Sequence, residues 1–145
     1  YEGPPDAEGT PFANGMRFHG LQVPDAPAIP LRHEGETVTV RLWWSTDHLL
    51  DADYSISLRA QYGETLVTQV DGPINIDGAP LETSRWQPGQ LYVDERTLAL
   101  PFPAGQGDYF LNLVVYQWWD GQPIGAPGAD DNGQLRVGRV YVKSW

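Results

Sequence analysis

The sequence contains no cysteine among its 145 residues. Disulfide bonds and cysteine-ligated zinc or iron–sulfur centres are therefore excluded, while the redox environment stays open because cysteine-free domains exist on both sides of membranes. A chain of this length buries roughly 70% of the surface that its unfolded form exposes, which is enough for one core without covalent cross-links.

Basic residues are scarce, with nine Lys and Arg against nineteen Asp and Glu, for a formal net charge of −10. This charge repels a phosphate backbone, so we expect no nucleic-acid partner. Long apolar runs are also missing. None approaches the ~20 residues that a membrane-spanning helix needs, so we expect no membrane span within this fragment. The chain begins at Tyr1 rather than Met, which predicts a processed product or a piece of a longer protein.

Motifs for common catalytic and metal sites are missing as well. There is no Gly-x-Ser-x-Gly sequence and no phosphate-binding glycine pattern, and His19, His33 and His48 lie too far apart for the short spacings of zinc ligands. The stretch 71–78 resembles part of an EF-hand loop, but Pro73 stands at its first ligand position. We therefore predict no catalytic residue, no metal and no cofactor.

The sequence is rich in residues typical of strands and turns: sixteen Gly and thirteen Pro occur beside six Trp and seven Tyr. Apolar and polar residues alternate over several stretches, which is the period of a strand with one buried face. In 37–46, for example, Val38, Val40, Leu42 and Trp44 share one face. The predicted strands are 16–23, with a bulge at Gly20, and 37–46, 53–62, 66–70, 91–100, 109–119 and 135–145.

About seven short strands separated by turns, with no helical period, predict an all-β fold, an antiparallel two-sheet sandwich of immunoglobulin-like type. A closed barrel is the alternative. Tyr109 follows a Gly-rich turn, where a tyrosine corner forms in such sandwiches, and Trp44 is a candidate central core residue. We predict that residues 1–15 form a linker or loosely attached arm, that 16–145 form the domain, and that 71–90 is a long, mostly irregular crossover.

Within that crossover, Trp86 stands between Arg85 and the turn pair Pro88-Gly89. Two interpretations are open: the indole grips a ligand, or it pins the loop to the body of the domain. We favour pinning, with Arg85 either stacked on the indole or paired with an acid such as Asp94.

The stretch "TSRWQPGQLYVDERTLALPFPAGQGDYFLNLVVY" contains a series of elements in a definite order. They fall on Arg85, Trp86, Pro88, Gly89, Asp94, Leu98, Leu100, Pro101, Gly107, Tyr109, Leu111, Leu113 and Tyr116. In this order they resemble the C-terminal β-sandwich region of bacterial membrane glycosyltransferase-like proteins, relatives of the dolichyl-phosphate-mannose protein mannosyltransferases. The resemblance covers about residues 16–142, and the Gln-Trp-Trp at 117–119 departs from the usual Asp-containing turn.

This resemblance implies a non-catalytic accessory domain of a larger membrane or surface protein, outside the cytoplasm. It implies no transferase chemistry in this chain, because the catalytic carboxylates of such enzymes belong to their membrane part. The implied localisation is extracytoplasmic, at the cell surface or attached to the membrane through the parent protein.

The aromatic residues indicate where a ligand could bind. If Tyr109 and Leu111 face the core, then Phe110, Val114, Tyr116 and Trp118 face outward. Aromatic and Arg side chains on one surface suit sugar rings or a protein partner. The alternative is that the loop 120–134 or the arm 1–15 covers them as a satellite core. The ligand-binding candidates are Tyr116, Trp118, Tyr141, Arg59, Arg139 and Trp86.

Three functions follow from these observations. The first is a domain that binds carbohydrate polymer or positions another part of its parent protein. The second is a structural or protein-interaction spacer. The third is a glycan-active hydrolase, for which nineteen acids supply carboxylate pairs by chance alone.

Overall fold

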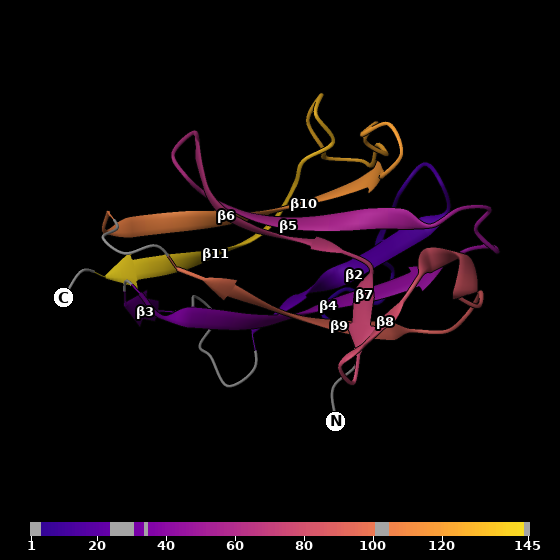
Figure 1. Cartoon of the computed structure of the whole chain (residues 1–145), viewed down its shortest axis with the longest axis horizontal. Helices are drawn as coiled ribbons and strands as arrows, with labels where there is room; N and C mark the ends of the chain where they lie inside the picture. Colours follow the sequence, from indigo (N-terminus) through magenta and orange to yellow (C-terminus); the bar gives the residue numbers. More distant parts are fainter. Residues whose placement is uncertain (1–3, 24–30, 34, 101–104, 144–145) are drawn as a thin grey trace.

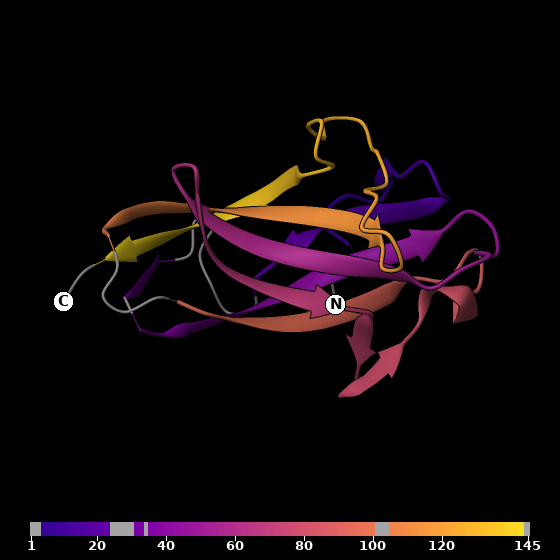
Figure 2. The ribbon, with the colours of Figure 1, turned by 45° about the horizontal axis from the view of Figure 1, so that its top comes forward.

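The computed structural model describes residues 4–23, 31–33, 35–100 and 105–143. Its described part forms two stacked sheets, seen as two layers in Figures 1 and 2. The smaller sheet has the order β1 (Thr10–Pro11), β2 (Met16–Gln22), β4 (Thr37–Thr46) and β9 (Tyr92–Ala99). The larger sheet has the order β3 (Leu31–His33), β11 (Leu135–Lys143), β10 (Gly107–Gln117), β5 (Tyr54–Tyr62) and β6 (Thr65–Gly72).

The predicted all-β sandwich is confirmed, and each predicted strand is present within a few residues of its expected bounds. The irregularity expected at Gly20 is also present, because the β2–β4 register shifts between Phe18 and Leu21. The sheets are not wholly antiparallel, however. The short strand β3, which was not predicted, pairs in parallel with β11.

The crossover 71–90 is more regular than predicted. It contains a hairpin of β7 (Ile74–Ile76) and β8 (Ala79–Leu81), followed by a 3-10 turn, η1 (Thr83–Arg85). Asp77 and Gly78 join the two strands with φ angles of 51° and 82°, the left-handed conformation that a tight two-residue hairpin turn requires. The signal was the Asp-Gly pair itself, which is the standard short-range mark of a hairpin.

The prediction of a loosely attached arm is wrong for residues 10–13. Thr10 pairs with Phe18, so β1 adds a strand to the smaller sheet. The Phe12 side chain is buried in the core, and the Ala13 N–H donates to the carbonyl of Gly125 at 2.9 Å. Burial of Phe12, the pairing of β1 with β2 and the Ala13–Gly125 hydrogen bond together offset the entropy of ordering this segment.

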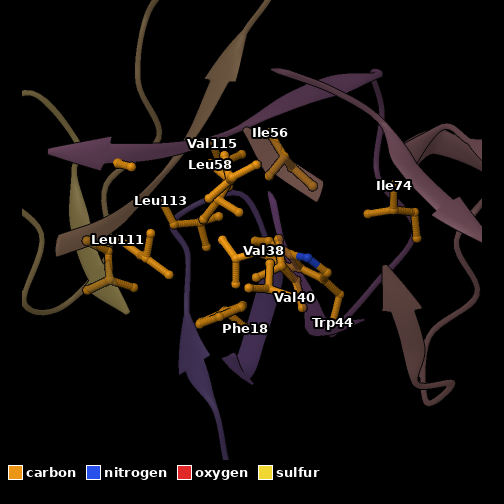
Figure 3. Packing of buried hydrophobic residues seen from close by; sticks show 14 of the residues in the cluster. Phe18, Val38, Val40, Trp44, Ile56, Leu58, Ile74, Leu111, Leu113 and Val115 are labelled. Atoms are coloured by element: carbon orange, nitrogen blue, oxygen red, sulfur yellow. The ribbon is translucent and has the colours of Figure 1, made fainter. Parts of the chain in front are cut away.

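The core lies between the sheets and is built from the alternating residues of their inner faces (Figure 3). Leu42, Ile56 and Leu113 are fully buried, as the two-residue period predicts. Trp44 is fully buried as well, and its ring lies 5.0 Å from that of Phe18 and 6.0 Å from that of Trp86, centroid to centroid. It is the central aromatic residue that the sequence indicated.

The tyrosine corner is present. The Tyr109 hydroxyl donates to the carbonyl of Gly105 at 2.8 Å, four residues upstream, and the Tyr109 ring stacks on Tyr62 with centroids 4.7 Å apart. The corner fixes the chain where it enters β10, the central strand of the larger sheet.

A buried ion pair joins the two sheets. Asp94 and Arg96 both lie on the inner face of β9, and Arg96 Nε donates to Asp94 Oδ2 at 2.6 Å. The two Nη groups of Arg96 donate to four carbonyls on and after strands of the other sheet: Ile56, Val70, Gly72 and Pro73. The remaining Asp94 oxygen accepts the Asn75 N–H at 2.7 Å.

Burial raises the pKa of the Asp94 carboxyl, while the charge of Arg96 and the Asn75 N–H act in the opposite direction. The pairing that the sequence suggested between Arg85 and Asp94 is wrong. Arg85 instead lies 3.7 Å from Glu82 at the surface.

We expect Arg96→Met to lower the free energy of unfolding by about 3–5 kcal/mol, because it leaves a buried carboxylate and several buried carbonyls without a donor. The control is Arg41→Met, which removes the exposed Arg41–Glu95 pair between β4 and β9 and should cost at most about 1 kcal/mol. Urea denaturation measures both. Equal losses in the two variants would contradict the role given to Arg96.

Candidate functional site

The outward-facing side chains of β5, β10 and β11 form a polar and aromatic surface, hereafter the outer face. Arg59 on β5 lies directly opposite Asn112 on β10, and Asn112 lies opposite Arg136 on β11. These three residues form a row across the middle of the larger sheet. In the neighbouring row, Gln61 lies opposite Phe110. Adjacent strands are about 4.8 Å apart, so a row of this kind is wide enough for one sugar ring or a short peptide.

Asn112 organises one half of the outer face. Its side chain is only 4% exposed, and its Nδ2 donates to Gln61 Oε1. Arg136 Nε donates to Asn112 Oδ1 at 3.4 Å, and the Arg136 guanidinium carbon lies 4.0 Å from the centroid of the Phe110 ring. A hollow of about 250 Å³ opens beside these groups, with Gln134 and Asp130 on its other side.

Arg59 organises the other half. Its Nε donates to the hydroxyl of Ser57, which is fully buried, at 3.0 Å. A second hollow of about 390 Å³ lies here, lined by Arg59, Val114, Tyr116, Gly121, Pro123 and Asn132. Arg59 and Tyr116 thus line one concave space.

The loop between β10 and β11 forms the rim of both hollows, and it is the orange-to-yellow segment that projects beside the end of β10 in Figures 1 and 2. Pro123 bridges to Tyr116, and the Ile124 N–H donates to Val115 O at 2.7 Å. Asp120 accepts hydrogen bonds from the Gln122 N–H and from the Gln117 amide, which lower the pKa of its carboxyl. Hydrogen bonds therefore hold residues 117–124 of the rim in a defined turn.

Five of the six predicted candidates lie at the surface, in three groups. Arg59 and Tyr116 lie together at the larger of the two hollows. Arg139 and Tyr141 lie farther along β11, where Arg139 is 3.5 Å from Asp108 and the Tyr141 hydroxyl accepts from the Gln106 amide. Trp118 lies beyond the end of β10 and is 66% exposed.

Both alternatives for the outer aromatic surface hold in part. Val114 is 3% exposed, so the surface is covered there, as the satellite-core alternative requires. Phe110 and Tyr116 are half-buried, whereas Trp118 and Trp119 are exposed, with their rings edge to face at 5.9 Å. The result is a partly covered concave site rather than an open aromatic patch.

Trp86 is not a surface residue, so its inclusion among the ligand candidates is wrong. It is fully buried, its Nε1 donates to Leu81 O at 3.3 Å, and its ring stacks on Tyr92 with centroids 5.4 Å apart. The Tyr92 hydroxyl in turn accepts the Gln87 N–H at 2.8 Å. The indole pins the segment after the hairpin to the core, which is the alternative that the sequence favoured.

Sequence reasoning missed Gln61, Asn112 and Arg136. Gln61 and Asn112 could have been found, because both lie on the outward parity of predicted strands. Arg136 was hidden by an irregularity: the β10–β11 register shifts between Leu111 and Asn112, so simple alternation from Arg139 gives the wrong partner.

Another hollow, of about 1030 Å³, lies over the smaller sheet between β9 and the β7–β8 hairpin. This hollow is larger, but the polar groups of its Trp and Arg side chains already have partners within the protein. Trp43 in its lining is only 5% exposed and its indole N–H is donated to Gln22 Oε1. Its two arginines, Arg41 and Arg85, each have an acidic partner. We therefore place the site on the outer face, where Arg59 and Arg136 have no acidic partner among the described residues.

Among the residues that the structure describes, no three His, Asp or Glu side chains gather closely enough to hold a metal ion. In the same part of the chain, no helix has the length and apolar character needed to cross a membrane.

Comparisons with known proteins show a similar fold. Neither the protein-family models nor the curated proteins give a match to this chain. Among solved structures, the crystal structure of the C-terminal domain of Wzt is similar, with a TM-score of 0.53 and 12% sequence identity, over 97% of this chain and 82% of that one. At this identity the likeness shows a shared sandwich fold. It does not support a link to the mannosyltransferase relatives.

Substitution of a buried and an exposed tryptophan tests whether Trp86 holds the crossover to the core. We expect Trp86→Ala to lower the free energy of unfolding by about 3–5 kcal/mol, because it opens a large cavity in the core. Trp118→Ala should change it by less than about 0.5 kcal/mol, because surface substitutions rarely cost more. Chemical denaturation followed by circular dichroism measures both values, and a Trp86→Ala variant as stable as the parent would show that the indole does not hold the crossover.

Proposed function

We propose that this chain is a non-catalytic domain that binds carbohydrate polymer on the outer face of its larger sheet. The observation that carries the proposal is the row Arg59, Asn112 and Arg136, set beside Phe110 and Tyr116 above two shallow hollows. Sugars present hydroxyl groups around an apolar ring face. This surface offers guanidinium groups for the first, with Arg136 positioned by the buried Asn112 amide, and aromatic rings for the second.

The rigidity of the surface supports binding over a purely structural role. Asn112 and Ser57 are buried, and each is hydrogen-bonded to a neighbour that also lies on the outer face. Arg59 and Arg136 are therefore held by fixed partners. Groups that are positioned before the ligand arrives lose less conformational entropy on binding.

The domain is proposed to serve a larger protein outside the cytoplasm. The fold likeness to a solved C-terminal domain supports membership of a larger protein, whereas the location outside the cytoplasm rests on the sequence resemblance. The specific parent, a membrane or surface glycosyltransferase-like protein, rests on the sequence resemblance alone.

Binding is tested with a glycan array, followed by tryptophan fluorescence titration of each hit. We expect saturable quenching by at least one polysaccharide. We expect Arg136→Ala to weaken that binding by about tenfold, since an arginine at the centre of a contact surface commonly contributes more than 1 kcal/mol.

The matched control is Arg41→Ala, an exposed arginine on the smaller sheet at the edge of the other hollow. This variant should bind the glycan with the same affinity as the unsubstituted protein. If Arg41→Ala loses binding and Arg136→Ala does not, the ligand occupies the other hollow. If the unsubstituted protein binds no glycan on the array, the spacer function is favoured instead.

A further inference from the structure

The arginines of this chain differ in whether an acid compensates them. The sequence has eight arginines in a chain of nineteen acids. Arg17, Arg41, Arg85, Arg96 and Arg139 each lie within 4.0 Å of a carboxylate oxygen. Arg59 and Arg136 have no such partner among the described residues, and both lie on the outer face. In this acidic chain, these two arginines without an acidic partner therefore share one surface.

The hollow at Arg59 contains no acidic residue in its lining. Within the described part of the chain, the hydrogen bond from Nε to Ser57 is the only one that the Arg59 side chain makes, which leaves both Nη groups available to a ligand. The acid placed across the neighbouring strands is Asp71, opposite Ser57, and its Oδ2 accepts from the Gln69 amide. Asp71 is therefore engaged along its own strand.

The hollow at Arg136 is different. Its lining includes Asp130, whose Oδ1 accepts the N–H groups of Asn132 and Gln134 at 2.9 Å each. The Arg136 guanidinium is also engaged by the Phe110 ring and by Asn112. A carboxylate in the lining disfavours an anion, so this half of the outer face suits an uncharged sugar.

We propose that the Arg59 hollow binds an anionic substituent of the carbohydrate polymer, a carboxylate or a phosphate ester. This inference rests on the proposed function and adds the class of sugar to it.

The geometry suits such a group. A guanidinium presents two parallel N–H donors that match the oxygens of a carboxylate or phosphate. The Tyr116 phenol and the Asn132 amide are in the same lining and can supply further donors. A volume of about 390 Å³ lies within the range of small-molecule sites, roughly 300–1,000 Å³.

The test compares ligands that differ in whether they carry an ionised group. One pair is oligogalacturonate and its methyl ester, and the other is phosphorylated and unphosphorylated mannan. We expect the unsubstituted protein to bind at least one charged member about tenfold more tightly than its neutral counterpart, because hydrogen bonds to charged groups are the stronger ones. Calorimetry measures both affinities. The pair that shows the difference identifies the anion as carboxylate or phosphate.

Variants assign the preference to one side chain. Arg59→Gln should bind the charged and neutral members equally, while Arg59→Lys should keep part of the preference because it keeps the charge. Arg85→Gln, which changes an exposed arginine of the 3-10 turn η1, should behave like the unsubstituted protein. Circular dichroism confirms that each variant is folded.

Three outcomes would overturn the inference: equal affinity for charged and neutral members, failure of both charged polymers to bind, or a preference that persists in Arg59→Gln. If neutral glycans still bind in a way that depends on Arg136, the proposed function stands and only the anionic specificity fails. If no glycan binds at all, both fail together.

Discussion

The hydrogen bonds of Arg96 join the two sheets where β9 of the smaller sheet faces β5 and β6 of the larger one. One guanidinium on β9 reaches carbonyls of β5 and β6 in the opposite sheet, at the place where β6 ends and the chain turns into the hairpin. Asp94 balances its charge and at the same time anchors the hairpin through Asn75. Backbone carbonyls left bare in a core are costly, so this one side chain allows β6 to leave the sheet without exposing its end to an apolar surface.

The fold follows closely from alternation, because a strand with one buried face leaves an unambiguous period in the sequence. Val38, Val40 and Leu42 illustrate it: all three are buried as their spacing requires. The pairing of Arg96 could not be found in the same way. The alternation on β9 places Arg96 on the side that faces the core. A charged residue there can be buried only when donors and acceptors from distant strands surround it. Sequence spacing does not show whether they do.

The candidate site was predictable in part for the same reason. Arg59 and Tyr116 were identified because outward parity on adjacent strands brings them to one surface, and the structure shows them lining one hollow. Arg136 escaped because a register shift changes which residues lie opposite one another. Trp86 was ambiguous because an isolated indole in an irregular segment has no period, and only the surrounding packing decides whether it faces solvent or the core.

The bond between Ala13 and Gly125 links the entry of the chain to the rim of the outer face. Residues 10–13 are tied to β2 on one side and to the β10–β11 loop on the other. A substitution that displaces residues 10–13 would therefore also remove one support of the loop that lines both hollows.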